Sequence, residues 1–199
     1  MFSGKRGLKV TINAPVVIGF VALCVAATLI NALTGGAANR VLFTVRRGSL
    51  LNPLTYLRCV THVIGHSGFD HLLGNMLYIL ILGPMLEEKY GKVNMIFVIL
   101  ATALITGVLS VILFPHNALC GASGVVFSMI LLSSITSVGE GELPLTFILV
   151  AALYLGQQVY QGLFIKDNVS QFAHILGGLV GAGLGFYMNR AGLTRYHKR

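Results

Sequence analysis

The stretch HSGFDHLLGN, residues 66–75, places three polar side chains where a long apolar run begins. His71 and Asn75 are four residues apart, so they share one face if the run is a helix. Both can donate hydrogen bonds, which is what a developing oxyanion requires. Polar side chains that enter a membrane are costly and usually mark function. We therefore expect His71 and Asn75 to act as donors, whereas His66 either fixes the entry to the helix or takes part directly.

Two further stretches carry groups suited to acyl transfer: GASG, residues 121–124, and FAHILGG, residues 172–178. The hydroxyl of Ser123 is a poor nucleophile unless a base takes its proton, and the imidazole of His174 can do so near neutral pH. Other interpretations stay open, because small residues such as serine also pack membrane helices. A histidine inside a span can equally be a structural residue or a proton relay.

Glycines on the predicted helices would allow this serine and this histidine to meet. Gly177, Gly181 and Gly185 follow His174 at steps of three and four residues, on the same helix face. A smooth glycine face lets a second helix come very near the histidine ring. If that helix carries Ser123, which has Gly121 and Gly124 beside it, a serine–histidine contact follows.

Composition points to a membrane protein. Hydrophobic residues make up 55% and charged residues 10% of the 199, with a mean hydropathy of +0.82, against about 25% charged residues in soluble domains. The net charge of +8 comes from cations between the apolar runs, which indicates topology signals and anionic lipid rather than nucleic acid. Cys24 is expected in a span, and Cys59 and Cys120 in loops. Their number and spacing fit neither a disulfide framework nor a metal site, and no cofactor is expected.

Six apolar runs predict one all-α integral membrane domain over residues 1–199, a six-helix bundle with an outer loop between its first two spans. The first run could instead be a signal peptide, but its apolar core is longer than such peptides carry. The weakest run is the fourth, which is rich in Ser and Gly. The runs cover roughly residues 14–34, 71–86, 93–114, 121–138, 144–164 and 172–189.

An even number of spans puts both termini on one side, and the positive charges indicate which side. We expect both termini in the cytoplasm of a bacterial cell, because that side collects the larger group of cations. Spans two, four and six then all begin on the outer side, so their polar groups lie at one depth. The inner cations are Lys5, Arg6, Lys9, Lys89, Lys92, Arg190, Arg195, Lys198 and Arg199, and the outer ones are Arg40, Arg46, Arg47, Arg58 and Lys166.

Four stretches together resemble the rhomboid intramembrane serine proteases of the six-helix type. They are LRCVTHVIGHSGFDHLLGN (57–75), GPMLEEKYG (83–91), GASGVVF (121–127) and AHILGGLVG (173–181). G-x-S-G alone is a weak signal, whereas its combination with H-x4-H-x3-N and H-x2-G-x3-G is highly specific. The stretches occur in the family's order and cover the six-helix core.

The resemblance implies an endopeptidase that cleaves transmembrane segments with a serine–histidine dyad. Ser123 would be the nucleophile and His174 the general base, with His71, Asn75 and the Ser123 backbone N–H around the oxyanion. Glu87 and Gly91 match positions with a structural role in the family. The other matching residues would support the site: His66, Phe127, Gly121, Gly124, Gly177 and Gly181.

Two positions depart from the family pattern. The outer loop carries Leu57 before Arg58 where the family has a tryptophan, and the chain contains no Trp at all. Many members have tyrosine one turn after the serine, and here the residue is Phe127. Its ring can still pack against His174, although it lacks a hydroxyl. Neither change touches the dyad, so we expect an active enzyme.

The acids supply no obvious third catalytic member. They are Asp70, Glu87, Glu88, Glu140, Glu142 and Asp167. Only Asp70 and Asp167 fall on the side of the serine, and neither is placed to orient His174. Three amides in the fifth span, Gln157, Gln158 and Gln161, either keep water near the site, line the route by which substrate enters, or bond neighbouring helices.

The expected partners are single-spanning membrane proteins and a bilayer with anionic lipids, while the oligomeric state is open. A non-catalytic protein on the same scaffold is the first alternative, and loss of the serine or histidine would mark it. A small transporter is the second, and it would string ionisable residues across the membrane thickness.

Overall fold

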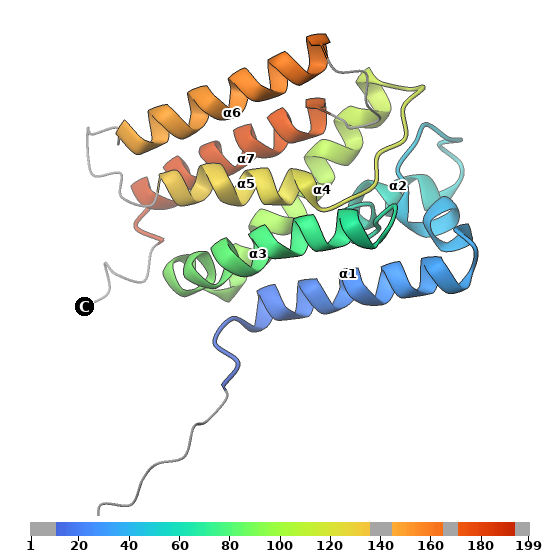
Figure 1. Cartoon of the computed structure of the whole chain (residues 1–199), viewed down its shortest axis with the longest axis horizontal. Coiled ribbons are helices and arrows are strands. Elements are labelled where there is room, and N and C mark those ends of the chain that lie inside the picture. Colours follow the sequence, from blue (N-terminus) through green and yellow to red (C-terminus); the bar gives the residue numbers. More distant parts are fainter. Residues whose placement is uncertain (1–10, 136–144, 165–170, 194–199) are drawn as a thin grey trace, which may run out of the picture.

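Helices account for the regular structure of the chain (Figure 1), in a computed structural model that describes residues 11–135, 145–164 and 171–193. The described residues contain no strand, only an isolated bridge between Val45 and Leu119. The predicted all-α fold class is therefore confirmed. The elements are α1 (Pro15–Leu33), the short π-helix η1 (Asn39–Phe43), α2 (Pro53–Thr61), α3 (Phe69–Tyr90), α4 (Lys92–Leu113), α5 (Ser123–Ser134), α6 (Leu145–Phe164) and α7 (Gln171–Arg190).

Six of these helices coincide with the six predicted apolar runs to within a few residues. By length and composition, α1, α3 and α4 are able to cross a membrane. Helix α5 has 12 residues, so it is about 18 Å long and shorter than the ~30 Å hydrocarbon layer. The chain is a multi-pass membrane protein, while the number of six crossings stays a prediction.

The connection between α1 and α3 is more ordered than the sequence predicts, because it contains η1 and α2. Helix α2 begins with Pro53 at its first position, and the Asn52 side chain accepts the N–H of Leu54 at 3.0 Å. Both are favourable at a helix start. Cys59, which we expected in a loop, lies buried within α2; that prediction is wrong, because a nine-residue helix carries no membrane-length apolar signal.

Helices α3 and α4 are joined by one residue, Gly91, whose φ of 84° suits glycine and reverses the chain. Near that turn the buried carboxylate of Glu87 accepts the backbone N–H groups of Val16 and Val17, at 3.1 and 2.9 Å. These N–H groups lie in the first turn of α1 and have no partner within the helix. Glu87 therefore fastens the start of α1 to the end of α3.

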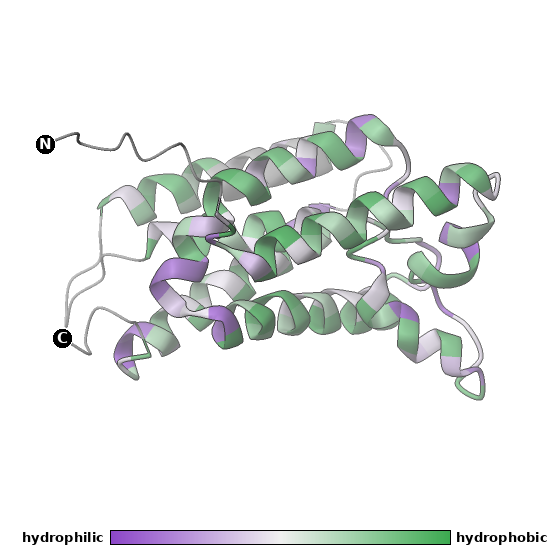
Figure 2. Ribbon diagram, turned by 90° about the horizontal axis from the view of Figure 1, so that it is seen from below, coloured by the Kyte–Doolittle hydropathy of each residue, from purple (hydrophilic) through white to green (hydrophobic). Residues whose placement is uncertain are grey.

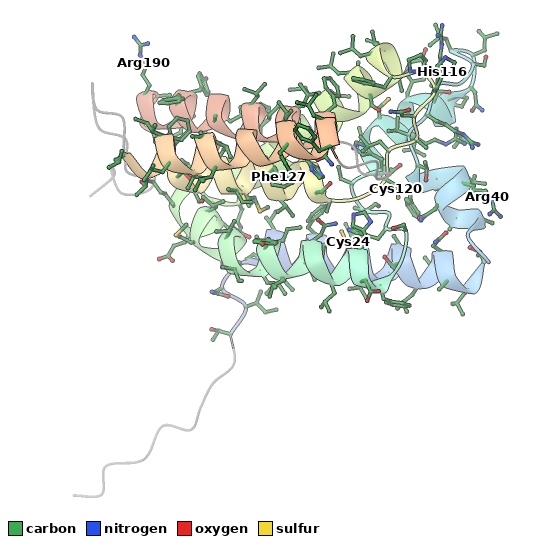
Figure 3. The ribbon with its side chains drawn as sticks, turned by 45° about the horizontal axis from the view of Figure 1, so that its top comes forward. Cys24, Arg40, His116, Cys120, Phe127 and Arg190 are labelled. Atoms are coloured by element: carbon green, nitrogen blue, oxygen red, sulfur yellow. The ribbon has the colours of Figure 1, made fainter. Side chains whose placement is uncertain are left out.

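Helix α5 lies inside the bundle and packs most extensively against α7, and also against α3 and α4. Apolar residues dominate along the helices, and hydrophilic residues gather towards the two ends of the bundle (Figure 2). Helices α3, α5 and α7 all begin at the same end, as the alternating direction of successive spans predicts (Figure 1). We call this the site end; Arg40 and His116 lie there, whereas Arg190 lies at the opposite end (Figure 3).

Candidate active site

Ser123 and His174 meet across the contact between α5 and α7. The Oγ of Ser123 and the Nε2 of His174 are 2.9 Å apart, within hydrogen-bond distance. Ser123 is the first residue of α5, and His174 lies in the first turn of α7. The predicted serine–histidine contact is therefore confirmed. Its geometry allows the ring nitrogen to accept the hydroxyl proton.

Phe127 covers one side of the histidine ring. Its ring centroid is 4.4 Å from that of His174, with the two planes at 45°. Phe127 lies one turn after Ser123 on α5, so both residues present to α7 from the same helix face. The predicted packing of Phe127 against His174 is confirmed. This contact restricts the tilt of the imidazole, although Phe127 lacks the hydroxyl group that a tyrosine would carry at that position.

The glycines of α7 allow the two helices to come into backbone contact. A Cβ on Gly177 would overlap the carbonyl oxygen of Gly124, and one on Gly181 would overlap that of Ser128. At Gly185, one turn further on, the helices are less close, because a Cβ there would lie 3.0 Å from a methyl group of Leu132 rather than against backbone. The backbone contact begins at Gly177, one turn after His174, so the predicted glycine face holds the two reacting side chains together.

His71 packs on the segment that leads into α5. A Cβ on Gly121 would lie 2.6 Å from the His71 Cε1 atom, and Gly121 has a φ of 134°. The backbone at that position thus requires glycine for two separate reasons. The Nδ1 of His71 is 3.1 Å from the Ser67 hydroxyl. His71 therefore faces the residues that precede Ser123, and its Nδ1 is held by the Ser67 hydroxyl.

Asn75, one turn after His71 on α3, is buried and carries an unused donor. Its Nδ2 has no hydrogen-bond partner in the part of the chain that the structure describes. Buried amide groups are normally paired, and an exception calls for a reason. The N–H of Ser123 likewise has no acceptor within α5, because it belongs to the first turn. Both groups have free donor capacity.

Two histidines before α3 hold the backbone just ahead of Ser123. The Nε2 of His66 accepts the Ala122 N–H at 3.4 Å, and its Nδ1 is 3.3 Å from the Ile64 carbonyl. The carbonyl of His62 accepts the Gly121 N–H at 2.9 Å. We call these two hydrogen bonds the histidine clamp. The N–H groups of Gly121 and Ala122 are therefore both hydrogen-bonded within the clamp, whereas the next N–H along the chain, that of Ser123, is not part of it.

Burial determines the charge state of the clamp. Burial lowers the pKa of His62 to about 4, and burial together with the nearby His71 lowers the pKa of His66 to about 4. Both rings are therefore neutral at pH 7, as His66 must be to accept a hydrogen bond through Nε2. The Nε2 of His62 is 3.3 Å from the Thr106 hydroxyl of α4.

His62 is not among the residues that the motifs single out. The signal that could have found it is the spacing of His62 and His66, four residues apart in a segment that also holds His71. The supporting position predicted for His66 agrees with its hydrogen bond to Ala122. Cys120 is a free thiol next to the clamp, and burial raises its pKa to about 11. It therefore stays protonated and unreactive at neutral pH.

Other predicted residues are placed as follows. Leu57, where the family has tryptophan, is exposed on α2, while Arg58 is buried and its Nε donates to the Val41 carbonyl at 2.8 Å. Asp70 begins α3 at the site end. Asp167 and the side chains of Gln157, Gln158 and Gln161 lie outside the described residues, so the predictions on them stay open.

The fold and this geometry define a class: a multi-pass, all-helical membrane protein with a serine–histidine pair at one end of its bundle. The family model described as "Rhomboid domain" matches residues 53–191. The chain therefore belongs to the rhomboid family, whose members are in general intramembrane serine proteases.

Three relatives illustrate the similarity. Rhomboid-related protein 2 of Mus musculus is 31% identical over 164 residues, which cover 72% of this chain and 54% of the relative. RHOMBOID-like protein 4 of Arabidopsis thaliana is 33% identical over 130 residues, 62% of this chain and 32% of the relative. Rhomboid protease GluP of Bacillus subtilis (strain 168) is 26% identical over 170 residues, 81% of this chain and 32% of the relative. The matched region thus spans about half or less of these relatives.

Proposed function

We propose that this chain is an intramembrane serine endopeptidase that cleaves transmembrane segments of membrane proteins with Ser123 and His174 as its dyad. The observation that carries the proposal is the 2.9 Å distance between the Ser123 Oγ and the His174 Nε2. Membership of the rhomboid family supports it.

The reaction needs only these two side chains and water as reacting groups. The Oγ of Ser123 attacks the scissile carbonyl carbon while its proton passes to the Nε2 of His174. The carbon–nitrogen bond then breaks, and the leaving amine takes that proton from His174. Water attacks the resulting ester while its proton passes to the Nε2 of His174. The bond between the acyl carbon and the Ser123 Oγ then breaks as His174 gives that proton to the Oγ, which releases the carboxylic acid product and restores the serine hydroxyl.

Three donors are suited to the negative charge that develops on the carbonyl oxygen. They are the Nδ2 of Asn75, the backbone N–H of Ser123 and the ring of His71, which packs on Gly121. A donor that is already in place when the charge develops costs no reorganisation during the reaction. The unused Nδ2 of Asn75 supports this role most directly.

The substrate would be a single-spanning protein whose helix unwinds near the site end. The scissile bond must be extended to reach Ser123, so residues that disfavour helix would ease cleavage. The excess of cations towards the termini supports a topology with both termini in the cytoplasm. A cell-membrane location in a bacterium is part of the same proposal.

A non-catalytic protein on the same scaffold is the alternative that must be separated by experiment. The contact between Ser123 and His174 argues against it, because a binding protein has no need to keep a serine hydroxyl on a histidine nitrogen. A transporter is disfavoured, because His66, His71 and His174 all lie at the site end rather than along the membrane thickness.

The decisive experiment incubates purified protein in detergent with a model transmembrane substrate. Ser123→Ala and His174→Ala should each lower cleavage on the order of 10⁴-fold or more. Ser134→Ala at the far end of α5 and the exposed His116→Ala are matched controls that should cleave like wild type. Equal cleavage by all five proteins would refute the proposed function.

A further inference from the structure

The imidazole ring of His71 is held by contacts that do not depend on where its proton lies. A Cβ on Gly121 would lie 2.6 Å from the Cε1 and 2.8 Å from the Nε2 of this ring, so that edge packs on the segment leading into α5. The ring of His66 meets it edge to face, with centroids 5.1 Å apart and planes at 70°. Packing therefore sets the orientation of the ring. It does not decide which of the two nitrogens carries the single proton of a neutral imidazole.

His66 shows how hydrogen-bond partners decide that question. The Ala122 N–H can only donate, so the His66 Nε2 that accepts it at 3.4 Å carries no proton. The Ile64 carbonyl can only accept, so the proton lies on the His66 Nδ1, 3.3 Å away. Backbone groups of fixed polarity thus assign the tautomer of His66, and both of its nitrogens are occupied.

The partner of His71 is a hydroxyl group, which can either donate or accept. The Oγ of Ser67 is 3.1 Å from the His71 Nδ1, and this is the only side-chain hydrogen bond that His71 makes within the described residues. Ser67 is exposed and lies two residues before α3 begins at Phe69. Its hydroxyl proton has no other acceptor in the part of the chain that the structure describes.

The neighbouring acid does not compete for the ring proton. Asp70 lies beside Val21 and Val25 of α1, whereas the ring of His71 lies against Gly121. Adjacent residues on a helix point in different directions, which is why the two side chains diverge. Ser67 is therefore the group that is placed to determine the tautomer of His71.

We propose that Ser67 is a positioning residue that fixes this tautomer by donating its hydroxyl proton to the His71 Nδ1. The ring proton then lies on Nε2, at the edge that packs on Gly121. An Nε2–H is what a developing oxyanion requires, whereas an unprotonated Nε2 would turn a lone pair towards the negative charge. The effect of this proton on turnover rests on the proposed protease function, while the tautomer itself does not.

The expected effect of Ser67 is smaller than that of the donor it controls. A single hydrogen bond of this kind shifts an equilibrium about 2–10-fold, so Ser67→Ala should change the ratio of the two tautomers by about that factor. The kcat should fall by no more than the same factor. Removal of His71 itself should cost about 10²–10³-fold, as for other oxyanion donors. A group that acts only in the transition state leaves KM unchanged.

The tautomer is read directly by solid-state NMR of protein with ¹⁵N-labelled histidine in phosphatidylcholine, at about pH 8, where an ordinary imidazole is neutral. Protonated and unprotonated ring nitrogens differ widely in chemical shift, and the His71 signals are those missing from His71→Gln. Wild type should show an unprotonated Nδ1 and a protonated Nε2. Ser67→Ala should contain a larger share of the opposite tautomer.

Two further variants separate the hydroxyl from a general effect of substitution. Ser67→Thr keeps the hydroxyl and should retain the wild-type signals of His71. Ser134→Ala, at the far end of α5, is the matched control and should also resemble wild type. A protonated Nδ1 in wild type overturns the proposal, and so do identical His71 signals in wild type and Ser67→Ala.

Cleavage of a model transmembrane substrate is measured on the same proteins. Ser67→Ala should lower kcat about 2–10-fold at unchanged KM, and Ser67→Thr should cleave like wild type. Thermal unfolding is measured alongside, because a purely structural role would lower the melting temperature and leave the tautomer unchanged. A changed tautomer with wild-type kcat overturns the link to turnover. If wild type cleaves no more than Ser123→Ala does, the proposed protease function fails, and the NMR result stands independently.

Discussion

Gly177 of α7 lies in backbone contact with Gly124 of α5, with no room for a Cβ between them. This contact lies three residues from His174 and one from Ser123, so the distance between the two helices there sets the distance between the reacting atoms. The chemistry of the site therefore depends on a pair of residues that have no side chains.

We expect Gly177→Ala to separate the helices and to damage both stability and cleavage. Overpacking of a tight contact costs about 1–3 kcal/mol, and a displaced His174 would lose its hydrogen bond to Ser123. Gly183→Ala is the matched control, because a Cβ there meets nothing within 4 Å. Thermal unfolding in detergent measures the difference; equal melting of the two variants would contradict the role of this contact.

Asn75→Ala should lower turnover far more than stability. Removing one oxyanion donor costs about 10²–10³-fold in kcat, while the Nδ2 of Asn75 makes no hydrogen bond to described residues that folding would miss. The comparison is Asn94→Ala, whose Nδ2 donates to the Tyr90 carbonyl at 2.9 Å. That variant should lose stability rather than turnover. A loss of stability for Asn75→Ala as large as its loss of turnover would count against the donor role.

Stability should fall as the pH is lowered from about 6.5 to about 4. His62 and His66 titrate near pH 4 in the folded protein, against the ordinary 6.5 when unfolded. Between these values the unfolded chain binds more protons, so the free energy of unfolding rises with pH and is lost on acidification. The lowered pKa of each histidine accounts for on the order of 3 kcal/mol of the free energy of unfolding that is lost on acidification. Thermal unfolding between pH 7.5 and pH 4.5 measures the effect.

The origin of this pH dependence is checked by substitution. His62→Gln/His66→Gln removes both titrating rings and should flatten the pH dependence, although it also weakens the clamp at neutral pH. The exposed His116→Gln should retain the full dependence. An identical pH profile in wild type and the double variant would show that other groups are responsible.

Glu87→Gln should destabilise the start of α1 by about 1.5–3 kcal/mol. The substitution removes a charged acceptor from the N-H groups of Val16 and Val17, and hydrogen bonds to charged groups are worth more than neutral ones. The neighbouring Glu88 is exposed and should tolerate the same change. Limited proteolysis before α1, together with unfolding in denaturant, measures it; equal effects at the two positions would argue against the tie between α1 and α3.

The sequence by itself was sufficient to predict the long helices that form the bundle and the end of the bundle at which each one begins. An apolar run of membrane length has helix as its open-ended solution, because the backbone must pair with itself in lipid. Counting the runs then puts His71, Ser123 and His174 at one end. The glycines after His174 indicate close packing, since small residues are what let two helices touch. These patterns predict a contact between Ser123 and His174, and the 2.9 Å distance between their Oγ and Nε2 atoms confirms it.

Only the tertiary structure decided what lies around that pair. The segments η1 and α2 are too short to carry an apolar period. Helix α2 is held by packing on α4, and η1 is held by packing on α2 and by the hydrogen bonds that Arg58 and Thr61 donate to its carbonyl groups. The carbonyl of His62 holds Gly121 through the main chain, and every residue has a carbonyl, so no side-chain pattern could predict it. The helices follow from local hydrophobicity, whereas the clamp depends on which backbone groups long-range packing brings together.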